Sequence, residues 1–418
     1  MTDRSEVSHL LRRLTFGPTA AEVDAAVAAG AGATLERVLA PIGRPATVPE
    51  AGPFRPGKEG RQEARRQATD AAWWWLTRMA SEPGAAEKLT FFWHGHWATS
   101  VRKVRSAALM LGQQQTLRRY GGGGTGPLVR AMLRDPALII WLDGQRNTRK
   151  APNENLAREV MELFTLGVGA YTEDDVKAGA RVLTGWRADR TTATATFVAA
   201  RHDPAPVTLL GRSGAFDIDS YADLLVQHPA HLPFLARRLW NRYGSPATPD
   251  AATTARLSAE RTTTGMLRSL VTAEAFTAAN GALVKQPVEW MTGAVRQLGV
   301  DLGALPQNKR GPILGGLRAL GQVPFRPPSV GGWPVGTPWL TTSSAQARLR
   351  YGQALTVLAP EAVETLAAAA RGDRTEALAR LLVVDAWSDR TRAVLSAATG
   401  EPRRLLALGL ASPEYTVH

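Results

Sequence analysis

The stretch from Asn153 to Gly167 constrains the fold of this chain most, because its apolar and polar residues separate onto two faces of one helix. At about 100° per residue, Leu156, Val160 and Leu163 fall on one side. The other side spans roughly 140° and is polar. It carries Glu154, Asn155, Arg158, Glu159 and Glu162. Asn153 can cap the start of this helix, and Gly167 stands where a glycine stop belongs.

This polar face has two interpretations. It can be a solvated face with an ion-pair ladder from Glu154 to Arg158 to Glu162, which stabilises a helix by a few tenths of a kcal/mol per pair, of order ~0.3. It can also line a cleft, because Glu159 and Glu162 are three residues apart and can point to one spot, as in carboxylate metal sites built on helices. Composition alone favours the solvated interpretation, since charged helix faces usually lie in water.

The same stretch belongs to a series of blocks that resembles the bacterial family known as domain of unknown function 1800. The blocks are residues 11–18, 92–100, 153–169, 171–176, 183–186, 202–203, 210–211, 324–328 and 332–334. They extend from near the N-terminus to about residue 350, so the resemblance covers most of the chain. The family has no established activity, and the resemblance therefore implies relatives without implying a reaction.

The pattern over the whole chain predicts a mainly α, multi-helical globular protein with one small β-hairpin. Thr19 with Glu22, and Thr172 with Asp175, predict capping boxes at the starts of two helices. A length of 418 residues, 44% hydrophobic and 21% charged, suits a large core. We expect an N-terminal helical lobe at 1–216, with the hairpin near 194–210, and a C-terminal helical lobe at 217–418. The two lobes are expected to form one continuous compact unit.

Cysteine is absent from the sequence, which excludes disulfides, zinc–thiolate sites, iron–sulfur clusters and cysteine nucleophiles. The N-terminus lacks an apolar signal core, and no stretch is apolar enough to span a membrane. A cytoplasmic location is the resulting expectation, although export signals in some members of the resembled family leave secretion open. The net charge of +13 permits acidic partners, but the arginines are scattered, which argues against nucleic acid.

The pair His94 and His96, separated by Gly95, is the short motif that most suggests a metal-binding or catalytic site. Residues two apart do not share a helix face, but they point the same way in an extended or turning segment, which Gly95 favours. Neutral imidazoles with aromatic walls make good metal ligands or general bases. The alternative is a pair of structural histidines held by hydrogen bonds.

A second His-containing pair, His202 and Asp203, is expected at the tip of the hairpin, between β-like segments at 194–200 and 207–210. The pair can reach a cleft from there, or it can form a simple Asp-Pro turn. The loop 321–344 is rich in Gly, Pro and Trp, and tryptophans such as Trp333 can stack on sugars. Arg102 belongs to a basic cluster that can meet an anion.

The leading hypothesis is a helical, metal-assisted enzyme, a hydrolase rather than an oxidoreductase, with a divalent metal ion at its centre. The predicted metal ligands are His94, His96, His202 and Asp203. The predicted catalytic residues are Glu154, Arg158, Glu159 and Glu162. The predicted substrate-binding residues are Trp97, Arg102, Asn155 and Trp333. The alternative hypothesis is a non-catalytic binding or assembly protein for an acidic polysaccharide or a protein partner, and under either one a small-molecule or saccharide ligand is expected.

Overall fold

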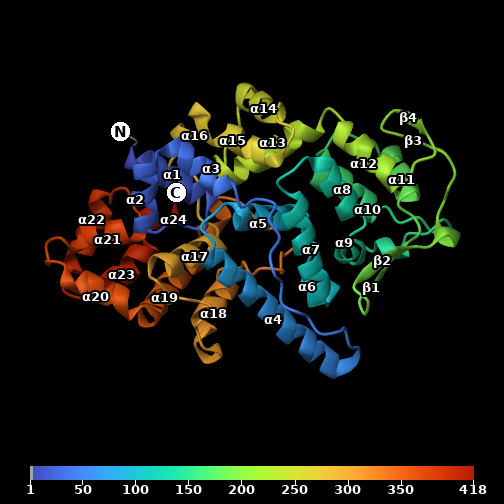
Figure 1. The fold of residues 1–418 in the computed structure, drawn as a ribbon. Coiled ribbons are helices and arrows are strands. Elements are labelled where there is room, and N and C mark those ends of the chain that lie inside the picture. Colours follow the sequence, from blue (N-terminus) through green and yellow to red (C-terminus); the bar gives the residue numbers. More distant parts are fainter. Residues whose placement is uncertain (1–2) are drawn as a thin grey trace.

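The computed structural model describes residues 3–418, and within that range the chain forms 24 α-helices and two small antiparallel sheets (Figure 1). The predicted mainly α, multi-helical fold is therefore confirmed. Among the described residues, no helix is long and apolar enough to cross a membrane.

The first four helices show how local signals set their ends. They are α1 (Arg4–Leu14), α2 (Ala20–Ala29), α3 (Ala31–Leu39) and α4 (Gly57–Ser81). Thr19 and Glu22 form the predicted capping box at the start of α2, in which each side chain binds the other residue's backbone N–H. The long helix α4 runs toward one edge of the molecule (Figure 1).

The middle of the chain supplies the helices around the candidate site. They are α5 (Ala86–His96), α6 (Val101–Val104), α7 (Ala107–Tyr120), α8 (Thr125–Leu133), α9 (Pro136–Trp141), α10 (Asn155–Glu159) and α11 (Glu173–Val182), with a short 3₁₀ turn η1 (Gly144–Arg146). Thr172 and Asp175 form the second predicted capping box, at the start of α11.

The stretch from Asn153 to Gly167, which we call the organising stretch, is helical, but its winding changes from an α-helix to a π-helix after Glu159. Its N-cap residue is Glu154, which makes no side-chain capping bond, so the predicted cap at Asn153 lies one residue too early; the Asn153 side chain still accepts the N–H of Asn155 at 3.1 Å. After α10 the chain continues as a π-helix, η2 (Val160–Thr165), and Gly167 follows its end with a φ of +85°. The sequence did not predict the π winding. Single π turns are rare and frequently occur at functional sites.

The prediction of a hairpin between 194–200 and 207–210 is wrong in its pairing. Strand β1 (Trp186–Asp189) pairs with β2 (Thr194–Phe197), and β3 (Val207–Leu209) pairs with β4 (Arg212–Gly214). Each pair has a tight local turn: Asp189 accepts the N–H of Thr191 at 2.6 Å, and Leu210 and Gly211 both adopt positive φ. Between the sheets, a 3₁₀ turn η3 (Ala199–Arg201) ends the strand-like segment.

The remaining chain is helical up to its end. The helices are α12 (Ile218–Gln227), α13 (His231–Tyr243), α14 (Ala251–Ser258), α15 (Thr263–Val271), α16 (Glu274–Ala278), α17 (Pro287–Gln297), α18 (Gly311–Ala319), α19 (Thr342–Leu358), α20 (Pro360–Ala368), α21 (Arg374–Leu382), α22 (Asp389–Ala397), α23 (Pro402–Ala411) and α24 (Pro413–Thr416). The 3₁₀ turns η4 (Gln307–Lys309) and η5 (Thr337–Trp339) lie in the loops.

Two hydrophobic clusters fill the interior, and each combines segments that are distant in sequence. The first joins Leu14 and Trp97 to Leu239. The second joins Trp75 and Phe91 to Trp290, Phe325 and Tyr415. Residues on both sides of position 216 contribute to each cluster. The division into lobes at 216 stays a prediction.

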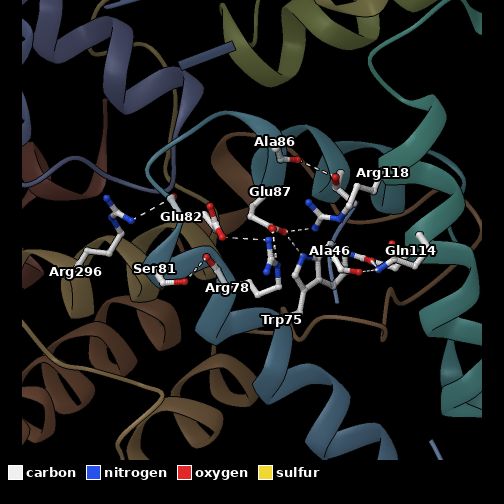
Figure 2. Close-up of polar contacts among 12 residues, drawn as sticks. Ala46, Trp75, Arg78, Ser81, Glu82, Ala86, Glu87, Gln114, Arg118 and Arg296 are labelled. Atoms are coloured by element: carbon white, nitrogen blue, oxygen red, sulfur yellow. Dashed lines mark hydrogen bonds and ion pairs between the residues drawn. The ribbon is translucent and has the colours of Figure 1, made fainter. Parts of the chain in front are cut away.

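A buried carboxylate ties together the helices that support α5. Glu87, only 1% exposed, accepts hydrogen bonds from Trp75 Nε1 at 2.9 Å, Arg78 Nε at 2.9 Å and Arg118 Nη2 at 2.6 Å (Figure 2). These partners come from α4 and α7. Glu87 therefore fixes α5, the helix that carries His94 and His96, between two long neighbours.

Candidate functional site

His94 and His96 lie on one continuous helix, so the predicted break at Gly95 is wrong. Helix α5 extends to His96. Gly95 serves a tertiary contact instead: a Cβ on Gly332 would lie 2.1 Å from the Gly95 carbonyl oxygen, and Gly332 has a φ of +80°. The loop that carries Trp333 thus packs directly on the helix backbone, and the two imidazoles leave the helix on different sides.

His94 is held in an apolar cage. Its ring lies 5.4 Å from that of Trp75, 5.5 Å from that of Phe325 and 5.4 Å from that of Trp333, between centroids. Its Nε2 accepts the backbone N–H of Phe325 at 3.1 Å. Burial lowers the pKa of His94 to about 3. The ring is therefore neutral at physiological pH, and its acceptor lone pair is already used by the protein.

His96 points toward the organising stretch. Its Nε2 lies 2.9 Å from the carbonyl oxygen of Phe164, in the π-helix η2, so this nitrogen carries the proton and donates it. Burial, reinforced by the positive charge of Arg238, lowers the pKa of His96 to about 3. Nδ1 is then an acceptor, and it is buried without a partner among residues 3–418.

A cavity of about 300 Å³ opens beside His96 and is shared by four segments of the chain. Helix α5 supplies Phe91, Phe92, Gly95 and His96, helix α13 supplies Arg238, Asn241 and Arg242, Gln286 precedes α17, and Trp333, Pro334 and Val335 come from the loop. The Trp333 ring stacks on that of Phe91, with centroids 5.2 Å apart. The cavity therefore has an aromatic wall opposite a polar, basic helix.

Five residues that line this cavity each carry a buried polar atom without a hydrogen-bond partner in the described chain. The atoms are His96 Nδ1, Arg238 Nε, Asn241 Oδ1, Arg242 Nη2 and Trp333 Nε1. Buried polar groups are nearly always paired in folded proteins, so each exception calls for a partner that the chain does not supply. Three of these atoms are donors and two are acceptors.

Arg242 links the cavity lining to a buried ion-pair cluster, whose other members, Lys88 and Glu289, do not line the cavity. Arg242 Nη1 and Lys88 Nζ both contact Glu289 Oε1, at 2.9 and 2.6 Å. Burial lowers the pKa of Lys88 to about 7, although Glu289 acts in the opposite direction. Arg238 and Arg242 line the cavity, and no aspartate or glutamate is among its described lining residues, so an anion in the cavity would be attracted.

The predicted catalytic residues lie on the polar face of α10 and η2, outside this cavity. Arg158 binds Glu173 at 2.7 Å and Glu154 at 3.1 Å, so the expected ladder to Glu162 does not form. Glu162 instead accepts the hydroxyl hydrogen of Tyr171 at 2.7 Å. Burial, followed by the charge of Glu162, raises the pKa of the half-buried Glu159.

The predicted metal ligands do not converge. His202 Nδ1 lies 3.1 Å from Thr184 Oγ1, and Asp203 accepts Arg181 Nε at 2.7 Å. Within residues 3–418, no group of three or more His, Asp or Glu side chains is arranged to hold a metal ion. A divalent metal at this protein's centre thus stays a prediction from the sequence.

Of the predicted substrate-binding residues, Trp333 alone lines the cavity. Trp97 is buried against Phe164, with ring centroids 4.6 Å apart. The Asn155 side chain donates to the carbonyl oxygen of Leu142 at 3.2 Å. Arg102 lies in a separate groove.

Sequence reasoning missed the contribution of α13. Arg238, Asn241 and Arg242 are spaced three and four residues apart and interrupt an otherwise apolar helix face. This polar stripe on one helix face could have been recognised in the sequence as a candidate part of a site. It gains meaning only when the loop with Trp333 is placed opposite it.

A family model described as "Protein of unknown function (DUF1800)" matches residues 9–417. No curated protein and no solved structure matches the chain. The match extends over nearly the full sequence, and the block pattern that resembles this family lies within it. The protein therefore belongs to the DUF1800 family.

Proposed function

We propose that the cavity beside His96 binds a small acidic saccharide, a sugar ring that carries a carboxylate. The observation that carries this proposal is that five of the residues lining one aromatic-walled cavity each hold a buried polar atom without a partner in the described chain. A sugar acid is the simplest ligand that answers all of these features.

The carboxylate of such a ligand matches the donors. Arg238 Nε, Arg242 Nη2 and Trp333 Nε1 each need an acceptor, and guanidinium–carboxylate hydrogen bonds are about twice as strong as neutral ones. The charges of Arg238 and Arg242, which both line the cavity, favour a negative charge at the same place.

The hydroxyl groups of the ligand match the acceptors. His96 Nδ1 and Asn241 Oδ1 require donors, and a carboxylate has none to offer at neutral pH. A sugar supplies hydroxyl donors close to its acid group. Its apolar C–H face can lie against the rings of Trp333 and Phe91.

Calorimetric titration with D-glucuronate tests the proposal. D-glucose, which has the sugar ring without the carboxylate, and acetate, which has the carboxylate without the ring, are titrated separately for comparison. Glucuronate is expected to bind, and each half much more weakly. Arg238→Gln should weaken glucuronate binding about tenfold, because one charge-assisted bond is lost. Arg237→Gln is the matched control, since Arg237 is the exposed neighbour of Arg238 on α13 and does not line the cavity.

Two results would contradict the proposal. Glucose binding as tightly as glucuronate would remove the role of the arginines. An equal loss in Arg237→Gln and Arg238→Gln would mean that only the overall charge of α13 matters. Trp333→Phe adds a finer readout, because it keeps the stacked ring and removes the N–H donor.

A further inference from the structure

A second hollow, of about 430 Å³, lies between the N-terminal half of α4, helix α6 and residue 326. Six arginines line it: Arg55, Arg61, Arg65, Arg102, Arg105 and Arg326. No aspartate or glutamate is among the described residues that line it. We call this hollow the arginine groove. It shares none of its lining residues with the cavity beside His96.

The guanidinium groups of the arginine groove have no acceptor within residues 3–418. None of the six donates a side-chain hydrogen bond or forms an ion pair there, whereas their neighbours Arg66 and Lys103 are paired with Glu63 and Asp143. The charges also act on one another: besides burial, Arg318, Arg102 and Arg65 lower the pKa of the half-buried Arg326. The groove therefore concentrates positive charge without an ion-paired carboxylate of its own, and the nearby Glu59 and Glu63 line a neighbouring hollow together with Arg55.

The backbone around the groove is built to bring these charges together. A Cβ on Gly60 would lie 1.9 Å from the carbonyl oxygen of Arg55, so only glycine lets this loop pack on the first turns of α4. The loop places Arg55 over the same hollow as Arg61 and Arg65. The groove also meets the N-terminus of the 25-residue helix α4, where free backbone N–H groups and the helix dipole favour anions.

The basic surface continues beyond the groove. An adjoining hollow is lined by Phe54, Arg102, Lys103, Arg105 and Arg190, three of which also line the arginine groove. The guanidinium of Arg190 lies 5.8 Å from the centre of the Phe54 ring and covers it. One face of the Phe54 ring is thus taken by Arg190.

We propose that the arginine groove binds a chain of consecutive phosphate groups, such as inorganic tripolyphosphate or the phosphate tail of a nucleotide. Six cations around so small a volume call for a compact, multiply charged anion. A uronate chain carries one negative charge per ring, and a nucleic acid carries one per nucleotide. Both therefore have fewer charges per unit length than a chain of consecutive phosphates. Arginine also matches phosphate oxygens with two parallel hydrogen bonds.

Calorimetric titration of the full chain with sodium tripolyphosphate, at about 0.15 M salt, tests this inference. The double variant Arg61→Gln/Arg65→Gln should weaken binding at least about tenfold. Arg37→Gln/Arg390→Gln is the matched control, because it removes the same charge from two exposed arginines that do not line the groove. It should bind like the unaltered protein.

Three comparison ligands separate the possible sources of the anion. ATP binding as tightly as tripolyphosphate, or more tightly, supports the groove and assigns it to a nucleotide tail. ATP binding more weakly supports the groove and assigns it to free oligophosphate. Tighter binding of single-stranded DNA or of an oligogalacturonate would overturn the proposal, as would an equal loss in the control variant. Thermal melting of both variants confirms that they are folded.

Discussion

At the scale of single residues, the two histidines of the HGH motif show how burial decides chemistry. Both rings are neutral at physiological pH because burial lowers the pKa of each to about 3. His94 gives its acceptor nitrogen to the backbone of Phe325, while His96 keeps an unpaired acceptor. The first is a structural residue, and the second belongs to the cavity. The sequence alone does not distinguish the roles of His94 and His96.

His94 is one of the buried histidines that make the stability of the fold depend on pH. Its pKa is 6.5 when unperturbed and about 3 in the folded chain. Its contribution to the free energy of unfolding is therefore complete above 6.5 and is lost as the pH falls toward 3. Between about pH 7 and about pH 5 this loss amounts to ~2 kcal/mol. His94→Gln should lose that much less than the unaltered protein in urea titrations at the two pH values, and equal losses would contradict the assignment.

Prediction from sequence also succeeds or fails residue by residue. The capping boxes at Thr19 and Thr172 were readable because both partners of each bond lie within one turn. The role of Gly95 was not readable, because it depends on Gly332, which the chain brings back only in the folded state. Arg238 was missed for the same reason: the residues that line the cavity with it come from α5 and the loop with Trp333.

At the scale of elements, helix α5 is the central support of the candidate site. Its first turn is fixed by Glu87, its last turn carries His96, and its middle packs on Trp333. Bonds from α4 and α7 converge on one carboxylate (Figure 2). The position of the cavity wall therefore depends on a buried ion-pair network.

Glu87→Gln tests that dependence. The amide would leave the guanidiniums of Arg78 and Arg118 without a full counter-charge in a buried place, where removal of one partner costs about 3–5 kcal/mol. Glu63→Gln is the control, because its pair with Arg66 is exposed and solvent screens the attraction, so a much smaller cost is expected. Urea unfolding gives both values. Similar costs for the two variants would show that Glu87 is not a structural centre.

The strands mark the limit of prediction at this scale. The segments at 194–197 and 207–209 were recognised as extended from their composition, but each pairs with a strand that was not recognised. Local turns at 189–194 and 210–211 decided the pairing. Strands this short contain too few residues for hydrophobic alternation to fix a partner.

At the scale of the whole molecule, the end of the described chain is part of the core. Tyr415 is fully buried, and its hydroxyl donates to Gln297 Oε1 at 2.8 Å. Residues 416–418 exchange backbone hydrogen bonds with residues 283–285. The helix α24 therefore locks α17 against the N-terminal part of the chain, where Gln297 also donates to the carbonyl oxygen of Pro18.

A graded pair of substitutions measures this lock. Tyr415→Ala should cost about 3–5 kcal/mol of unfolding free energy, because a large ring leaves a cavity. Tyr415→Phe should cost about 1–3 kcal/mol, since it only leaves Gln297 Oε1 unpaired. Denaturant titration separates the two. If the phenylalanine variant were as unstable as the alanine variant, the hydroxyl rather than the packing would hold α24.

The interleaving of the two hydrophobic clusters has a consequence for biosynthesis. Trp75 and Phe91 leave the ribosome long before Trp290 and Tyr415, yet all four belong to one cluster. A nascent chain that ends before residue 284 exposes aromatic side chains whose partners have not been made. Such a chain cannot finish folding domain by domain during translation, as separable domains do. Its early helices cannot complete their packing until the last helices are synthesised, and we expect chaperones to bind the exposed apolar surface until then.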